Sequence, residues 1–92
     1  MNNEKRVENY LIAEWGKVTR GVCIKFPPLF YAGFPDRICL AYPALIIFVE
    51  TKARGKRPSL LQNKTHAKLR ALGFRVEVLD TREAVDCFIL TL

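Results

Sequence analysis

The stretch GFPDRICLAYPALIIFVETKA, residues 33–53, contains two apolar runs separated by Tyr42-Pro43-Ala44. The second run, residues 45–49, is short and rich in β-branched and aromatic side chains, which is typical of a buried strand. Residues 37–41 predict another strand before it. Three residues are a common length for a hairpin loop. The two strands are therefore expected to pair antiparallel around Pro43.

This pairing brings charged side chains together. Asp36 would lie directly opposite Glu50, with Cβ atoms about 4.5–5.5 Å apart on one face of the sheet. Lys52 points to the same face, because side chains alternate along a strand. Two carboxylates this close repel each other unless a cation lies between them. We therefore expect a metal site formed by Asp36, Glu50 and the backbone carbonyl of Thr51.

The expected site has a specific chemical use. Mg²⁺ prefers oxygen ligands, keeps several waters, and is typically held by one or two carboxylates plus substrate phosphates. Such a cation lowers the pKa of a water and shields charge on a phosphate. Lys52 would orient that water or stabilise the charge that develops in the transition state. The residues predict metal-assisted phosphodiester hydrolysis, with Mg²⁺ or Mn²⁺ as the cofactor.

The rest of the chain predicts one α/β domain that spans residues 1–92. The expected elements are helix 4–19, strand 21–26, strand 37–41, strand 44–52, helix 59–72, strand 75–79 and helix 82–90. The order is α-β-β-β-α-β-α, around a mixed sheet of about four strands flanked by helices. Apolar residues at helical spacing support the first helix, and Gly73 is expected to end the helix before the last strand.

Composition restricts the class of partner. The net charge is +6, from 15 Lys and Arg against 9 Asp and Glu, which favours a polyanion such as nucleic acid. The three cysteines form no metal-binding pattern. No signal peptide opens the sequence, and the longest apolar run, residues 44–49, is far too short to span a membrane. We expect a cytoplasmic protein in a reducing compartment, with no membrane partner.

Four segments form an ordered series along the chain. They are residues 33–37 (GFPDR), residues 48–53 (FVETKA), Gln62 and residues 69–76 (LRALGFRV). This series resembles the VRR-NUC domain, a family of the PD-(D/E)XK nuclease superfamily, whose motif here reads Pro35-Asp36 and Glu50-Thr51-Lys52. The resemblance extends from about Glu8 to about Ala84. It implies a PD-(D/E)XK nuclease-like fold.

The resemblance also implies roles for particular residues. Asp36 and Glu50 would be metal ligands, Lys52 the catalytic lysine, Gln62 an assisting glutamine on a helix, and Glu8 an acidic residue of the first helix. Lys25 matches a lysine often found before the loop. Phe34 and Thr51 depart from the commoner aliphatic residues, but neither change removes a chemical group.

Because the chain is little more than this domain, it resembles the stand-alone members of phages and bacteria. That resemblance implies an endonuclease for branched DNA, foremost four-way (Holliday) junctions, which acts as a homodimer in the cytoplasm of a bacterial or phage-infected cell. No small-molecule cofactor is expected. The alternatives are a nuclease for flaps, nicks or duplex DNA, and a DNA-binding module that keeps the fold without cleavage.

Basic side chains follow the expected metal site along the chain. The candidates for contact with DNA are Lys25, Arg54, Lys56, Arg57, Lys64 and Lys68. Lys and Arg on a loop and helix beside a metal site suit contacts with the phosphate backbone, which position a duplex without reading its sequence. The alternative is a solvated basic face.

Several site residues also have structural explanations. Asp36 after a proline suits a turn, and Glu50 with Lys52 suits the solvated end of a strand. Ser59 and Gln62 form a capping box at the start of a helix. His66, four residues after Gln62, is expected at the surface of that helix.

Apolar residues exceed what one small core needs. Two groups stand out, around the proline loop (Phe26, Leu29, Phe30, Tyr31) and at the C-terminus (Phe88, Ile89, Leu90, Leu92). Exposed apolar patches mark interaction surfaces, which supports the expected dimer. Alternatively, both groups belong to the core.

Overall fold

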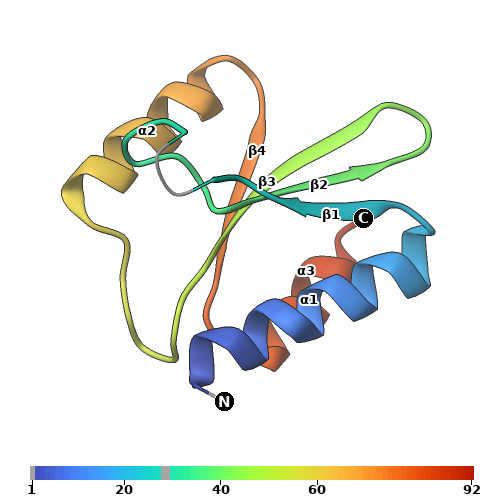
Figure 1. Ribbon diagram of the computed structural model, residues 1–92. Coiled ribbons are helices and arrows are strands. Elements are labelled where there is room, and N and C mark those ends of the chain that lie inside the picture. The colour runs from blue at the N-terminus through green and yellow to red at the C-terminus, as the bar shows by residue number, and fades with distance from the viewer. Residues whose placement is uncertain (1, 28–29) are drawn as a thin grey trace.

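The computed structural model describes residues 2–27 and 30–92. The elements are α1 (Asn3–Thr19), β1 (Val22–Lys25), β2 (Arg37–Ala41), β3 (Leu45–Thr51), α2 (Leu60–Ala71), β4 (Arg75–Leu79) and α3 (Arg82–Leu90) (Figure 1). The predicted order α-β-β-β-α-β-α is confirmed, and so is the mixed four-stranded sheet with flanking helices. Within the described residues, no helix is both long and apolar enough to cross a membrane.

The strands lie in the order β1-β2-β3-β4. The first three are antiparallel, because hairpin connections reverse the chain, whereas β4 runs parallel to β3 after the crossover through α2. Arg37 lies opposite Val49 and Ala41 lies opposite Leu45, which is the register expected from a loop at residues 42–44. The next pair in this register is Asp36 and Glu50, which therefore lie opposite each other at the open end of the hairpin.

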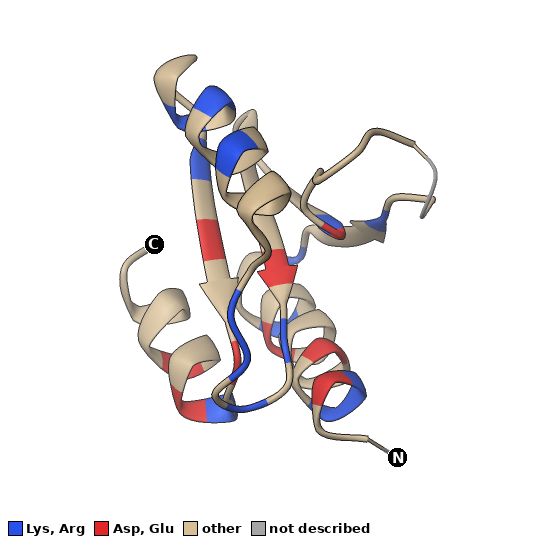
Figure 2. Cartoon of the chain, turned by 90° about the vertical axis from the view of Figure 1, so that its left-hand side faces the viewer, with Lys and Arg blue, Asp and Glu red and all other residues tan. Residues whose placement is uncertain are grey.

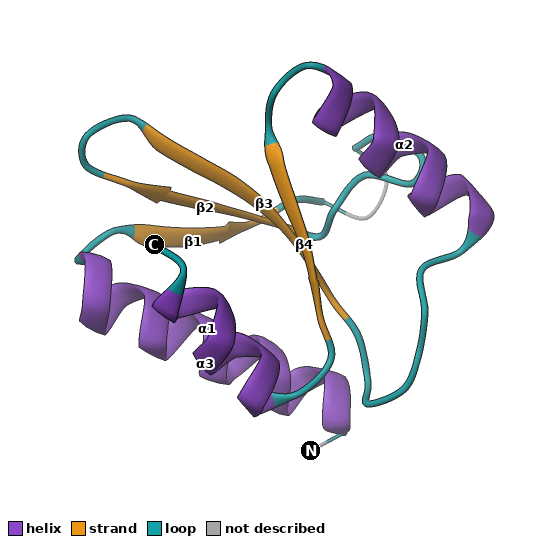
Figure 3. Cartoon of the chain, turned by 180° about the vertical axis from the view of Figure 1, so that it is seen from behind, coloured by secondary structure: helices purple, strands orange, loops and turns teal. Residues whose placement is uncertain are grey.

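One face of the sheet is covered by α1 and α3 (Figure 3). The core between them is formed by buried residues that include Leu11, Trp15, Val49, Val85 and Phe88. The indole of Trp15 stacks on the ring of Phe88 at 6.0 Å between centroids, and its Nε1 donates to the carbonyl of Leu40. Full burial of these side chains fixes α1 against the sheet and places its N-terminal end beside the predicted site.

The opposite face is only partly covered. At the end near the predicted site, the rings of Phe26, Phe34, Phe48 and Phe74 contact one another, and Phe48 is buried among them. Toward the hairpin loop, Val22, Ile46 and Tyr42 are exposed, and on the edge strand Ile24, opposite Ile38, is exposed as well. Cys23 and Ile47 pack with the core on the α1 side, so the neighbouring Val22, Ile24 and Ile46 point the other way. We call Val22, Ile24, Tyr42 and Ile46 the open sheet face.

Candidate active site

Four predicted site residues line one hollow of about 280 Å³. Asp36 immediately precedes β2, Glu50 is the second-last residue of β3, Lys52 follows β3, and Gln62 lies in the first turn of α2. The hairpin register and the crossover helix together bring them to one end of the sheet. Lys25, Tyr31 and Phe34 also line this hollow.

Asp36 is held in place by Thr51, the last residue of β3. Its Oδ1 accepts from the backbone N–H of Thr51 at 3.0 Å, and its Oδ2 accepts from the Thr51 hydroxyl at 2.7 Å. Burial raises the pKa of Asp36, the two Thr51 hydrogen bonds oppose that rise, and the charges of Glu8 and Glu4 add to it. The sequence did not indicate this anchoring by Thr51, whose backbone carbonyl stays a predicted metal ligand.

Glu50 carries a carboxylate that is almost fully buried, with 4% of the residue exposed. Its Oε2 lies 3.6 Å from Lys52 Nζ and accepts from Gln62 Nε2 at 3.4 Å. Burial and the neighbouring Asp36 charge raise the pKa of Glu50 to about 7, against the opposing effect of Lys52. Lys52 therefore lies on the same face as Glu50, as the alternation of strand side chains requires.

Gln62 serves two contacts at once. Its Oε1 accepts from the backbone N–H of Ser59 at 2.8 Å, and the Ser59 hydroxyl accepts from the Gln62 N–H at 3.1 Å. This is the capping box that the sequence indicates, and the free amide group of Gln62 still reaches Glu50. Gln62 can therefore cap α2 and support Glu50 at the same time.

His66 was expected at the helix surface, and this expectation is wrong. The side chain is fully buried, and its Nε2 lies 3.6 Å from Glu50 Oε1. Burial lowers the pKa of His66, and the nearby charges of Arg70 and Lys52 lower it further. The only signal in the sequence was the spacing of four residues between Gln62 and His66, which places both on one side of α2.

Glu8 does not line the main hollow. Its carboxylate is buried in ion pairs with Arg37 Nε at 3.1 Å and with Lys5 Nζ at 2.9 Å. Burial alone would raise the pKa of Glu8, but the contacts with Lys5 and Arg37 outweigh burial and hold the pKa below its ordinary value. Glu8 lines an adjoining hollow with Asp36 and Lys25. The acidic residue of α1 that lines the main hollow is Glu4.

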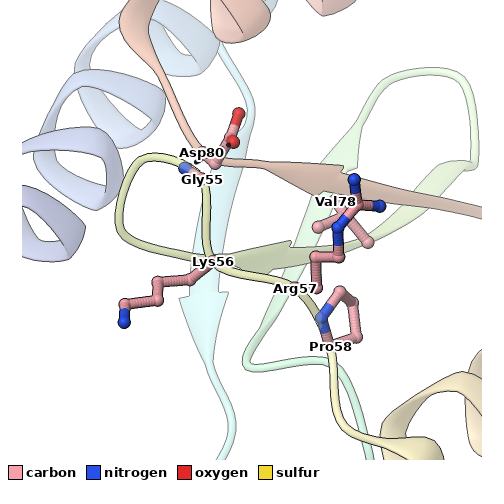
Figure 4. A pocket seen from close by; sticks show the side chains of 6 residues that line it. All are labelled: Gly55, Lys56, Arg57, Pro58, Val78 and Asp80. Atoms are coloured by element: carbon pink, nitrogen blue, oxygen red, sulfur yellow. Dashed lines mark hydrogen bonds between the residues drawn. The ribbon is translucent and has the colours of Figure 1, made fainter.

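Apart from Lys25 at the end of β1, the predicted DNA-contacting residues lie on the loop after β3 and on α2. Figure 2 shows Lys and Arg along that loop and on the same side of α2. Lys56 and Arg57 line a separate hollow of about 320 Å³ and point in different directions from the loop (Figure 4). The loop is tied to the end of β4 by a hydrogen bond from the Gly55 N–H to Asp80 Oδ2 at 3.1 Å. Lys64 and Lys68 are exposed on α2.

The donor set fits a hard divalent cation. Within residues 2–27 and 30–92, no group of three or more His, Cys, Asp or Glu side chains is placed to hold a metal. Three carboxylates, those of Glu4, Asp36 and Glu50, do line one hollow. The pKa values of Asp36 and Glu50 are both raised by burial and by neighbouring negative charge. Two carboxylates with remaining sites for water match the way proteins hold Mg²⁺, and a thiolate or imidazole site for zinc is not formed by these two residues.

Comparisons with known proteins agree with this geometry. No known family's sequence model matches the chain. A protein of Acyrthosiphon pisum secondary endosymbiont phage 1, named "Putative nuclease p44", is 40% identical over 80 residues, which cover 87% of this chain and 85% of that protein. A solved structure described as a VRR_NUC domain superposes with a TM-score of 0.88 and 26% identity, over 98% of this chain and 97% of the other. The chain therefore belongs to the VRR-NUC family of nucleases.

Proposed function

We propose that this nuclease is a Mg²⁺- or Mn²⁺-dependent endonuclease that cuts branched DNA, foremost four-way junctions, as a homodimer in the cytoplasm of a bacterial or phage-infected cell. The observation that carries the metal dependence is the pair of neighbouring carboxylates, the partly buried Asp36 and the buried Glu50, which share one hollow with Lys52. Buried charges are normally paired. Three carboxylates share this hollow with two lysines, Lys25 and Lys52. Among the described residues, Lys52 pairs with Glu50, and Asp36 has no ion-pair partner.

The residues have distinct tasks in this mechanism. Asp36 and the Oε2 atom of Glu50 would hold the cation, with the Thr51 carbonyl as a third ligand. Such a cation supplies a nucleophile from water at neutral pH and shields the phosphate charge. Lys52 donates toward the attacking water or the developing phosphate charge, since its Nζ already lies 3.6 Å from Glu50. Gln62 supports Glu50 from α2.

The DNA would lie across the loop after β3 and the outer side of α2. Arg54, Lys56 and Arg57 are exposed on the loop that links the site to α2, so they can follow a phosphate backbone into the hollow. Lys25 lines the hollow itself and would contact the phosphate nearest the cut. These contacts supply affinity and register without base recognition.

Two-fold symmetry supports the choice of a four-way junction. Resolving a junction requires paired cuts on opposed strands, and each chain provides one hollow with the catalytic set. A closed dimer provides two such sites. Of the apolar groups considered from the sequence, Phe88 is buried, whereas Phe30, Tyr31, Leu90 and Leu92 are exposed, and Leu29 lies outside the described residues. The open sheet face adds a further exposed apolar surface.

Cleavage assays test the proposal directly. The purified protein is incubated with labelled linear duplex, flap and four-way DNA, in Mg²⁺, Mn²⁺ or EDTA. We expect metal-dependent paired nicks in the four-way substrate, and no cleavage in EDTA. Preferred cutting of flaps or duplex would replace the junction assignment, and binding without cleavage in either metal would leave a DNA-binding module.

A further inference from the structure

Three buried atoms at one place lack hydrogen-bond partners. Among the described residues, the unpartnered buried side-chain atoms are Glu50 Oε1 and both ring nitrogens of His66. Leaving a buried donor or acceptor unpaired costs about 1–3 kcal/mol. The three atoms are neighbours, because His66 Nε2 lies 3.6 Å from Glu50 Oε1. Two of these atoms therefore face each other across a gap slightly longer than a hydrogen bond.

The two oxygens of Glu50 have separate surroundings. Oε2 meets Lys52 and Gln62, both of which line the hollow. Oε1 has almost no solvent contact, and His66 is not among the residues that line the hollow. A ligand that enters from the hollow thus meets Oε2, whereas Oε1 is buried and lies 3.6 Å from His66 Nε2.

We propose that His66 is a positioning residue, whose Nε2–H donates to Glu50 Oε1 and fixes the carboxylate so that Oε2 is presented to the cation. This inference rests on the proposed metal site. Approach by about 0.5 Å brings the two atoms into the usual hydrogen-bond range of about 2.7–3.2 Å. Partners behind a metal-binding carboxylate orient it and typically change metal affinity by about 10–100-fold when removed.

The fold explains why this role falls to α2. Gln62 and His66 are four residues apart, so one face of the helix carries both groups that contact Glu50, one to each oxygen. The capping box fixes the first turn of α2, which carries Gln62. The helix can therefore hold Glu50 from both sides.

Metal binding by three variants tests the proposal. His66→Gln keeps an N–H group near the position of Nε2, whereas His66→Leu keeps bulk but removes the donor. Thr65→Val is the matched control, because it removes a buried hydrogen bond from the same helix without touching Glu50. Mn²⁺ affinity is measured by the loss of the free-ion electron paramagnetic resonance signal, and folding is followed by circular dichroism and thermal unfolding.

We expect His66→Leu to bind Mn²⁺ at least tenfold more weakly than the unaltered protein, with His66→Gln and Thr65→Val each within about threefold of it. Unchanged affinity in His66→Leu, or an equal loss in His66→Gln and His66→Leu, would overturn the positioning role. An equal loss in Thr65→Val would also overturn it, because packing of α2 would then explain the effect. If the unaltered protein binds no Mn²⁺, the proposed metal site itself fails.

A measurement without metal keeps the inference testable if a variant does not fold. In the unaltered protein in EDTA, long-range ¹H–¹⁵N spectra of the His66 ring should show the proton on Nε2. The ring signals should shift in Glu50→Gln, where the acceptor is changed. A proton on Nδ1 would overturn the proposal, whatever the outcome for metal binding or cleavage.

Discussion

The carboxylate of Glu50 is buried beside Asp36, and burial together with that charge raises its pKa to about 7 from 4.5. The folded protein therefore binds a proton at this group more tightly than the unfolded chain does. Between pH 4.5 and pH 7 the folded state loses stability as the pH rises, because ionising Glu50 costs more when it is folded. The carboxylate proposed to hold the cation is thus destabilising in the metal-free protein at neutral pH.

The destabilising effect of ionised Glu50 predicts that a neutral side chain at this position stabilises the metal-free protein. In EDTA at pH 8, Glu50→Gln should unfold with a free energy higher than that of the unaltered protein, by on the order of 2–3 kcal/mol. Near pH 4.5 the difference should become small, since Glu50 is then protonated in the folded state. Urea unfolding at both pH values measures it. Equal stabilities at pH 8 would contradict the raised pKa.

Substitution of the catalytic residues should separate binding from cleavage. Asp36→Ala or Glu50→Ala removes a predicted metal ligand and a negative charge that faces phosphate, so cleavage is lost while DNA affinity is kept or improved. Lys52→Ala should retain the metal but lose about 10²–10³-fold in rate. Lys17→Ala, an exposed lysine of α1, is the control. Substantial metal-dependent cleavage by Glu50→Ala would contradict the site assignment.

At the scale of elements, the hairpin was predictable because its loop length and apolar runs fix the register, and the register brings Asp36 to Glu50.

The orientation of α2 could not be predicted from the sequence. Leu60 and Leu72 are 84% and 73% exposed, whereas Thr65 and His66 are buried. The positions of the leucines therefore do not reveal which side of this helix is buried. The burial of His66 depends on the packing of α2 over the end of the sheet, which no local pattern encodes.

The end of α1 shows a second limit of local patterns. Gly21 suggests a helix stop, but the residue in the left-handed conformation is Arg20, with φ 59°. Gly21 is needed for another reason, since a Cβ there would lie 1.9 Å from the carbonyl oxygen of Leu40. The close approach of the chain to β2 is a tertiary contact, and a glycine in the sequence does not distinguish it from a helix cap.

The loop after β3 predicts how DNA binding depends on salt. Neutralising Arg54, Lys56 and Arg57 together should weaken binding to all sequences and flatten the slope of log K against log salt by about 2–3, because fewer counterions are released. The matched control neutralises Arg6, Lys17 and Arg20 of α1 and its cap, with the same change of charge. Equal changes of slope in the two variants would show a general effect of net charge. An unchanged slope in the variant of the loop after β3 would show that DNA does not contact this loop.

At the scale of the whole molecule, the fold leaves a large part of one sheet face without a covering element. A domain of this size buries only a limited share of its surface, so exposed apolar side chains on a flat face are candidates for an interface. Val22 and Ile24 are 54% and 48% exposed, and they lie on the edge strand β1. An isologous contact centred on the part of this face toward the hairpin loop would leave the hollow with Asp36 and Glu50 open to DNA in both copies.

The dimer prediction follows from this arrangement. Light scattering at micromolar concentration should give twice 10.6 kDa for the unaltered protein. Val22→Asp with Ile24→Lys should give a monomer that retains metal-dependent nicking but loses paired cuts, because each monomer would carry one complete set of the proposed catalytic residues. Leu72→Lys, which alters the exposed apolar residue at the C-cap of α2, is the control and should remain dimeric.

Two outcomes would contradict this interface. If Leu90→Lys or Phe30→Lys dissociates the dimer while Val22→Asp with Ile24→Lys does not, the interface lies at the C-terminus or the proline loop. A mass near 10.6 kDa for the unaltered protein would exclude the dimer and with it symmetric resolution of junctions.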